Sequence, residues 1–391
     1  MNLRKNKLVI ITNGIHCKDS KENFYIRSGF ETQINDFAKR FKEVELYSPK
    51  TELKIKGTKL IKGIRVYPLS KDIHNNHLEL ILKFPEYVFS LIKIISKQEI
   101  NTIFLIYIPA SYIGLIALFL TKVFRSKVIC RVTNDLVLEH NIRRNYYGKK
   151  IINMVLNFFY NPLLNFLLKN YPSFFSGNIF LKEKSNFYQI TSLSFTKSQI
   201  PTNIRPRKNI KNIYFVGRFD ENKGVMNIFK IIDSLPYNIN LNIIGWGEQE
   251  CLIKKKYFSL NKNDRRRVNL IGFVPFGKEL FEHYKLADIL LFPSKAEYQG
   301  KSYLEAMFFG CPVIASDLPA IRQFIKHGEN GYLFDPNNIN EIVKYINLLN
   351  KEPDILNSIS SNAYQSVKNF SVESINDFVY SKSCVYYQSK G

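Results

Sequence analysis

Two glutamates, Glu297 and Glu305, are separated by seven residues in a chain that is otherwise strongly basic. The chain contains 56 Lys and Arg against 33 Asp and Glu, which gives a formal net charge of +23. Carboxylates accept hydrogen bonds from hydroxyl groups, so such a pair suits the binding of polyols such as a ribose and a sugar. A surface acid is the alternative for either glutamate taken alone.

The residues between the glutamates predict a turn followed by a helix. Gly300 permits the turn, and the helix is expected to begin near Lys301, so that the amides of Ser302 and its neighbour face a ligand. Glu305 would then lie about one turn inside the helix and accept hydrogen bonds from vicinal ribose hydroxyls. Glu297, in the preceding loop, would meet the transferred sugar.

A second candidate lies after the β-branched run that begins at Asn212. Arg218 and Lys223 flank a polar loop, and Gly224 opens a helix whose N-terminus could hold an anion. A guanidinium and an ammonium could together neutralise the charge that builds on a departing nucleotide diphosphate. Two solvated loop cations are an equally good interpretation of these residues alone.

The rest of the chain alternates short β-branched runs with helical patterns, which is typical of parallel sheets built from βαβ units. One set of runs begins at Lys7, Val44, Ile64, Thr102, Lys127 and Gly177. A second set begins at Asn212, Ile239, Val268, Asp288, Pro312 and Gly331. The stretch between the sets, 201–209, contains two prolines and basic residues and suits a linker. In such sheets ligands bind beyond the carboxyl ends of the strands, where the candidate residues lie.

Five motifs, in the order in which they occur, resemble the C-terminal half of the family 4 retaining glycosyltransferases, members of the glycosyl transferases group 1. The motifs are VGRFDENKG, NIIGWGEQE, VNLIGFV, EYQGKSYLEAMFFGCPVIASD and HGENGYLFDP. The resemblance implies that Glu297 binds the donor sugar, Glu305 the ribose, and Arg218 and Lys223 the diphosphate. Arg218, Lys223 and Glu297 are therefore the predicted catalytic residues.

The same resemblance implies further donor contacts. The backbone near Phe273 and Val274 would contact the base, and the predicted helix start at Gly300, Lys301 and Ser302 would complete the donor-binding set.

The N-terminal half matches more weakly, through the segment RSGFETQINDFAKRF, which looks like the family's glycine-rich loop and first helix. Ser28 replaces the usual first glycine, and Gly29 would let the helix N-terminus approach the donor phosphates; an ordinary loop glycine is the alternative. Many members have a His in an acceptor-side loop, where this chain has Asn134. Asn134 and Asp135 are therefore the acceptor-side candidates. A front-side transfer, in which a donor phosphate oxygen takes the acceptor proton, needs no protein base.

We therefore predict an α/β protein of GT-B fold, in which two doubly wound Rossmann-like domains face a cleft. Residues 1–200 would form the acceptor-side domain, and residues 201–375 the nucleotide-sugar-binding domain. A C-terminal helix over 376–391 would pack back on the N-terminal domain.

We expect neither a metal nor a cofactor, only the nucleotide-sugar donor as a substrate. No Asp-x-Asp occurs, and the six histidines and five cysteines show no metal-ligand or CxxC spacing. Scattered cysteines and the short apolar run at the N-terminus predict a cytoplasmic protein, free or peripheral on the inner face of the cell membrane.

Two segments bear on the membrane. The uncharged stretch 102–121 predicts a buried strand, Ile103 to Ile108, and a helix, Ser111 to Phe124, with a membrane span or contact with a membrane surface as the alternatives. Residues 140–181 contain no acidic residue and ten aromatics, which favours contact with anionic lipid. Its basic residues include Arg143, Arg144, Lys149, Lys150 and Lys169. The alternative is a helix with an aromatic core face and a solvated basic face.

The expected partners are a nucleotide-diphosphate sugar, a glycan or lipid-linked acceptor, and an anionic membrane surface, but no nucleic acid.

Two other classes of protein would share some of these sequence features. A non-catalytic protein that binds nucleic acid or membrane would share the positive charge, without requiring the two glutamates beside Arg218 and Lys223. A GT-B epimerase or sugar phosphorylase would share the fold, but would release UDP without an acceptor or require inorganic phosphate.

Overall fold

The computed structural model describes residues 5–21, 23–51, 57–69, 83–108, 112–133, 156–177, 181–191 and 193–390. The chain divides into two compact units, of which unit 1 comprises Met1–Ser194 with Ser371–Gly391, and unit 2 comprises Phe195–Phe370. The sequence placed these boundaries at residues 200 and 375.

Unit 1 is built on a seven-stranded sheet in the order β11-β10-β9-β8-β1-β4-β7, and every neighbouring pair is parallel. Its strands are β1 (Lys7–Ile11), β4 (Glu43–Ser48), β7 (Arg65–Pro68), β8 (Ile103–Ile108), β9 (Lys127–Val132), β10 (Ser173–Ser176) and β11 (Phe187–Ile190). The chain winds outward from β1 in one direction and from β8 in the other. This is the doubly wound topology that the sequence predicted.

Five of the six strands predicted for this unit are confirmed. The run predicted from Gly177 falls after β10, which ends at Ser176, and its residues 178–180 lie outside the described part of the chain. The edge strand β11 was missed because its sequence, FYQI, buries only its two ends. A small mixed sheet was also missed; it contains β2 (His16–Lys18), β3 (Phe24–Arg27), β5 (Lys50–Thr51) and β6 (Thr58–Leu60).

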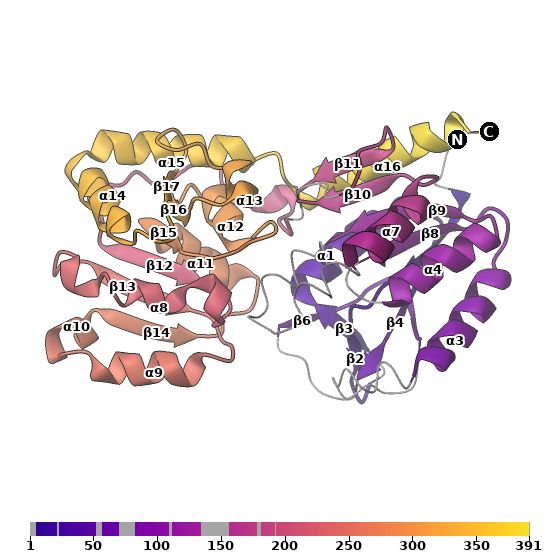
Figure 1. Cartoon of the computed structure of the whole chain (residues 1–391), viewed down its shortest axis with the longest axis horizontal. Helices are drawn as coiled ribbons and strands as arrows, with labels where there is room; N and C mark the ends of the chain where they lie inside the picture. The colour runs from indigo at the N-terminus through magenta and orange to yellow at the C-terminus, as the bar shows by residue number, and fades with distance from the viewer. Residues whose placement is uncertain are drawn as a thin grey trace. The chain divides into compact units, whose positions relative to one another are not determined.

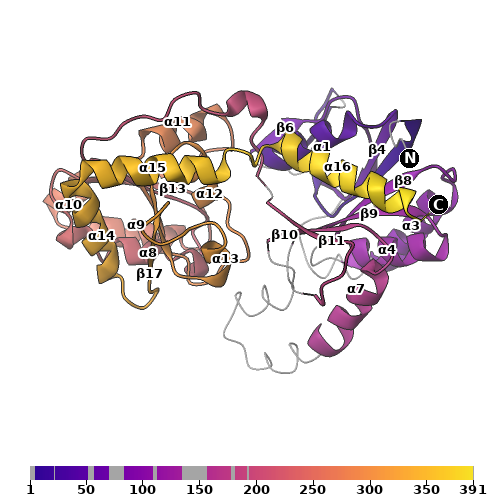
Figure 2. The ribbon, with the colours of Figure 1, turned by 90° about the horizontal axis from the view of Figure 1, so that it is seen from above.

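Helices cover both faces of the seven-stranded sheet (Figures 1 and 2). One face is covered by α1 (Ser28–Ala38) and α16 (Val372–Gln388), and the other by α3 (Phe84–Ser96), α4 (Tyr112–Val123), the π-helical turn η2 (Leu156–Tyr160) and α7 (Asn161–Leu168). Gly114 lets α4 lie close to β8, since a Cβ there would be 2.6 Å from the Tyr107 carbonyl oxygen. The predicted strand and helix of the uncharged stretch are thus confirmed. None of the helices in the described residues is long and apolar enough to span a bilayer.

The last helix, α16, is held against α1 by buried polar contacts. The Asn376 side chain donates to the Gln33 carbonyl oxygen and to Asp36 Oδ2, each at 3.0 Å. Arg40 bridges the two helices by pairing with Asp36 at 2.8 Å and with Asp377 at 2.6 Å. Residues from opposite ends of the chain therefore share one core in unit 1.

Unit 2 contains a six-stranded parallel sheet in the order β14-β13-β12-β15-β16-β17. Its strands are β12 (Asn212–Val216), β13 (Asn240–Ile244), β14 (Val268–Gly272), β15 (Ile289–Phe292), β16 (Val313–Ser316) and β17 (Tyr332–Phe334). All six strands predicted for this half are confirmed.

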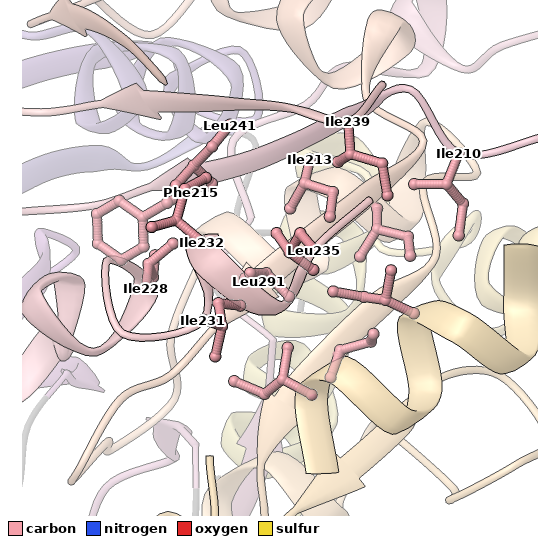
Figure 3. Close-up of a cluster of buried hydrophobic side chains, with 14 of the residues drawn as sticks. Ile210, Ile213, Phe215, Ile228, Ile231, Ile232, Leu235, Ile239, Leu241 and Leu291 are labelled. Carbon is pink, nitrogen blue, oxygen red and sulfur yellow. The ribbon is translucent and has the colours of Figure 1, made fainter. Parts of the chain in front are cut away.

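Alternate side chains of β12 enter the core on one side of this sheet. Figure 3 shows Ile213 and Phe215 among side chains from the following segment, which include Ile228, Ile232 and Leu235. The helices of unit 2 are α8 (Val225–Ile228), α9 (Glu250–Ser259), α10 (Lys262–Arg266), α11 (Lys278–Leu286), α12 (Ser302–Phe308), α13 (Pro319–Arg322), α14 (Asn340–Lys351) and α15 (Pro353–Val367).

The stretch 201–209, interpreted above as a linker, is anchored to unit 2. Arg207 is only 2% exposed and donates to the Ala287 carbonyl oxygen at 3.1 Å and to Ser360 Oγ at 2.7 Å. Arg205 pairs with Asp288 at 2.5 Å. Basic residues near prolines look like a solvated linker in sequence, but a guanidinium can be buried where carbonyl and hydroxyl oxygens satisfy its donors.

Gly224 brings the loop after β12 against the end of β15. Its φ of +67° is in the left-handed region, and a Cβ at this position would overlap the Pro293 carbonyl oxygen. The two loops are also joined by Lys295, whose amide donates to the Asn222 carbonyl oxygen at 2.7 Å and whose ammonium pairs with Glu221 at 2.8 Å. This close approach requires glycine.

We expect Gly224→Ala to destabilise unit 2 more than Gly328→Ala. Gly328 has a similar φ of +77° but open space around a Cβ. Gly328→Ala should therefore lower the free energy of unfolding only by the left-handed backbone strain of about 1–2 kcal/mol. Gly224→Ala must also move the Pro293 backbone, which adds roughly 1–3 kcal/mol. Urea unfolding, monitored by the fluorescence of Trp246, the single tryptophan of the chain, measures the free energy of unfolding of both variants. Equal losses of stability in the two variants would show that Gly224 does not pack tightly against the Pro293 carbonyl oxygen.

Candidate functional site

The predicted site residues of unit 2 gather at the point where its sheet changes winding direction. The chain winds from β12 through β13 to β14 on one side, and from β15 through β16 to β17 on the other. Open α/β sheets bind ligands beyond the carboxyl ends of the strands at such a switch point. Arg218 and Lys223 follow β12, and Glu297 follows β15, so the structure brings the three predicted catalytic residues to this point.

Lys223 and Glu297 form an ion pair across the switch point. Their side chains are only 18% and 11% exposed, and the Lys223 ammonium lies 5.4 Å from the centroid of the Phe292 ring. The sequence assigned the two residues to different ligand groups and did not predict their contact. An ammonium has three N–H groups, so Lys223 can hold Glu297 and still donate to an anion.

Arg218 is an accessible cation of the site. Its side chain is 68% exposed and pairs with Asp220 at 3.0 Å. Asp220 also accepts from the Lys223 amide at 3.1 Å and so caps the short 3₁₀ turn η4 (Glu221–Lys223). Because exposed ion pairs are weak, the guanidinium can leave Asp220 for an anionic ligand at little cost.

Glu305 is buried rather than a surface acid. It lies in the first turn of α12, is 7% exposed, and accepts a hydrogen bond from the Tyr284 hydroxyl at 2.8 Å. Burial raises the pKa of Glu305, while the Tyr284 hydroxyl and the Lys301 charge act to lower it. Tyr284 was not predicted as a site residue, because its role depends on how α11 packs against α12.

The turn between Glu297 and Glu305 is tightly packed. Gly300 has a φ of +72°, and a Cβ there would be 2.8 Å from Tyr303 Cε1 and 3.0 Å from Phe292 Cζ. The helix begins at Ser302, with Lys301 as its N-cap, as predicted. Tyr303 is fully buried, and burial, with a smaller effect of the Glu297 charge, raises the pKa of Tyr303 well above its usual value. The loop conformation is therefore set by aromatic packing as well as by the glycine.

Phe273 and Val274 follow β14, next to the end of β13. Val274 is buried, whereas Phe273 is 37% exposed and lies edge-on to Trp246, with ring centroids 6.1 Å apart. Trp246 was not predicted as a site residue. The glycines on either side of it, Gly245 and Gly247, were the available signal, because a Cβ at either position would press on the backbone of residues 217–219.

Of the predicted site residues in the N-terminal half, Gly29 lies in the described part of the chain. Gly29 is the second residue of α1, and a Cβ there would be 2.7 Å from Ser194 Oγ, so close packing within unit 1 explains the glycine. Asn134 and Asp135 lie outside the described residues.

The described residues do not bring His, Cys, Asp and Glu side chains together in a group of three or more that could hold a metal ion. His74 and His77 lie outside the described part of the chain. The charged groups at the switch point include Arg218, Lys223, Glu297 and Glu305, with Asp220 beside Arg218 and Lys301 at the start of α12.

Two curated proteins match about half of this chain. An uncharacterized glycosyltransferase from Haemophilus influenzae is 28% identical over 198 residues, which cover 50% of this chain and 55% of the relative. The alpha-monoglucosyldiacylglycerol synthase of Acholeplasma laidlawii is 30% identical over 199 residues, which cover 49% of this chain and 47% of the relative. The chain spans about half the length of these relatives.

A solved structure matches over nearly the whole length. HepE from Anabaena, in complex with UDP and glucose, aligns with a TM-score of 0.66 over 96% of this chain and 98% of its own, at 15% identity. That likeness concerns the fold, which is GT-B with two Rossmann-like domains. The model of the glycosyl transferases group 1 family matches residues 175–366, which include all the site residues of unit 2. The chain thus contains a glycosyl transferases group 1 domain in a GT-B fold.

Proposed function

We propose that this chain is a family 4 retaining glycosyltransferase, which moves a hexose from a nucleotide-diphosphate sugar to a glycan or lipid-linked acceptor. The observation that supports this most is the Lys223–Glu297 ion pair at the switch point, with Arg218 on the same loop as the lysine. The pair puts an anion-binding cation and a hydroxyl-binding carboxylate side by side, as the two halves of a nucleotide sugar require.

In this proposal, the diphosphate of the donor is bound by Arg218 and by the N–H groups of Lys223 that Glu297 leaves free. Glu297 accepts hydrogen bonds from hydroxyls of the sugar. Glu305, oriented by the Tyr284 hydroxyl, accepts from the ribose hydroxyls, and its burial makes the hydrogen bonds that it gains strong. The backbone at Phe273 and Val274 contacts the base.

The proposed reaction retains the anomeric configuration. The bond between the anomeric carbon and the phosphate oxygen breaks, and the acceptor oxygen bonds to the same face of that carbon. The acceptor proton goes to a phosphate oxygen of the leaving nucleotide diphosphate. Arg218 and Lys223 stabilise the negative charge that develops on this leaving group. Glu297 holds the sugar in the geometry that the transfer requires.

The acceptor is proposed from the relatives and from charge. The relative from Acholeplasma laidlawii is an alpha-monoglucosyldiacylglycerol synthase, whose name specifies a lipid product. A basic chain of this kind suits a lipid-linked or anionic glycan acceptor at the inner face of the cell membrane, in polysaccharide or glycoconjugate synthesis.

Glutamate variants separate the two carboxylate roles. We expect Glu305→Gln to weaken a free nucleotide diphosphate and the matching nucleotide sugar by a similar factor, about ten- to hundredfold, because both ligands contain the ribose. We expect Glu297→Gln to leave the affinity for the free diphosphate unchanged or higher, because Lys223 is released from its ion pair. The same variant should lower turnover more than donor affinity. Calorimetry with UDP, GDP and ADP, and with their nucleotide sugars, measures the affinity of each variant for the free diphosphate and for the donor.

Glu282→Gln is the matched control, since Glu282 is an exposed acid of unit 2 paired only with Lys285. It should change neither binding nor turnover. If both site variants bind and turn over like this control, the two carboxylates have no role in the donor site. Sugar release that requires inorganic phosphate, or UDP release without an acceptor, would indicate a phosphorylase or an epimerase instead.

We expect transfer to persist in excess EDTA. The sequence contains no Asp-x-Asp, and in the proposed site Arg218 and Lys223 supply the positive charge that a divalent ion would otherwise provide. The check is the initial rate of transfer with EDTA and, separately, with added manganese. Activity that is lost in EDTA and restored by manganese would contradict the metal-independent proposal.

A further inference from the structure

The outer surface of α4, η2 and α7 in unit 1 is unusually apolar. Five large side chains on these elements are between 48% and 65% exposed: Phe119, Val123, Phe159, Leu163 and Phe166. Single exposed apolar side chains are ordinary, but contiguous apolar patches on a monomer mark interaction sites.

These side chains form one patch, here named the α4–α7 face. Phe119 and Val123 are four residues apart in α4, so they lie on one side of that helix. Leu163 and Phe166 are three residues apart in α7, and Phe159 lies four residues before Leu163, in η2. Lys122 joins the two stripes, because its ammonium lies 3.5 Å from the centroid of the Phe166 ring and donates to the Phe166 carbonyl oxygen at 3.2 Å. Figure 1 shows α4 and α7 as neighbours in unit 1.

Three lysines, Lys122, Lys169 and Lys184, border the α4–α7 face. Lys169 also lies over the Phe166 ring, at 4.6 Å, and Lys184 donates to the Asn165 carbonyl oxygen at 3.3 Å. Partial burial, together with the charges of Lys169 and Lys184, lowers the pKa of Lys122. None of these three lysines forms an ion pair with a described residue.

The segments that build this face contain few acids. Residues 112–133 and 156–177 contain no Asp or Glu, and residues 181–191 contain only Glu183. The face therefore combines phenylalanines that can enter an acyl layer with flexible cations that can reach its phosphates. A protein partner would instead be expected to meet aromatic anchors within a rim of mixed polar residues.

We propose that the α4–α7 face docks on a bilayer that contains anionic lipid, with Phe159, Leu163 and Phe166 inserted at the interface and Lys122, Lys169 and Lys184 at the headgroup phosphates. The proposal does not depend on the transfer reaction. The η2 and α7 of this face belong to the segment 140–181, for which the sequence predicted contact with anionic lipid, and the face adds α4 and Lys184 to that segment. Arg143, Arg144, Lys149 and Lys150 of the same segment lie outside the described residues. For α4 the sequence favoured a helix packed on the sheet, with contact with a membrane surface as one of the alternatives.

The test is flotation of the full chain, without substrates, with vesicles of phosphatidylcholine alone or with 30% phosphatidylglycerol. We expect flotation with the anionic vesicles only. Phe159→Ser with Leu163→Ser should reduce the partition coefficient about tenfold or more, because both side chains leave the apolar layer. Lys169→Gln with Lys184→Gln should reduce it by a similar factor at low salt and have less effect at high salt, since the attraction is screened.

Leu252→Ser with Phe258→Ser is the matched control, because these residues are 53% and 64% exposed on α9 of unit 2. It should float like the unaltered chain. All variants should keep their thermal unfolding and their affinity for nucleotide diphosphate, which separates lost docking from lost folding and from failure of the proposed enzyme function.

Four results would overturn the proposal. The first is absence of flotation with anionic vesicles, and the second is unchanged flotation of both face variants. The third is a dimer in the absence of vesicles that the Phe159→Ser, Leu163→Ser variant dissociates, which would make the face an interface between two copies. Capture of single-stranded polynucleotide in place of anionic vesicles, lost in the same variants, would likewise assign the face to nucleic acid.

Discussion

The contact between Gly224 and the Pro293 carbonyl oxygen determines where the charged groups of unit 2 can meet. It holds the loop after β12 against the loop after β15, which are separated along the chain but adjacent in the sheet. Without this approach Lys223 and Glu297 would lie on separate, solvated loops. Because the pair is only partly exposed, each member is kept in place by the other before a ligand arrives. The site is therefore ordered by backbone packing first and by charge second.

Burial of Glu305 places a second constraint on the same region. A carboxylate that is nearly inaccessible to water loses hydration, which one hydroxyl from Tyr284 replaces only in part. The unliganded protein is thus less stable than it would be with an apolar side chain here. Such local costs are common where a protein keeps polar groups ready for a ligand.

The sequence predicted the parallel strands well, because strands buried on both faces are continuous β-branched runs such as NIYFV and DILLF. It also predicted which loop residues gather, since the carboxyl ends of neighbouring strands must share an edge. It did not predict the Lys223–Glu297 pair, the Tyr284 hydrogen bond or the burial of Arg207. These depend on how loops and helices pack, which residue types and spacing do not encode locally. Contact of α4 with a membrane surface was only an alternative interpretation of the sequence, because the core-facing residues of this helix already explain its apolar composition.

The packing of α16 on α1 has a consequence for biosynthesis. Asn376 contacts Gln33 across 343 residues of sequence, so unit 1 cannot complete its core until the whole of unit 2 has left the ribosome. Unit 2 is one continuous segment and can fold during translation, whereas the first 194 residues must wait with one side of their sheet incompletely covered. Contacts of such long range form slowly. The protein therefore most needs a chaperone while unit 1 is synthesised but its last helix is not. A chain that lacks this helix would keep the incompletely covered sheet permanently.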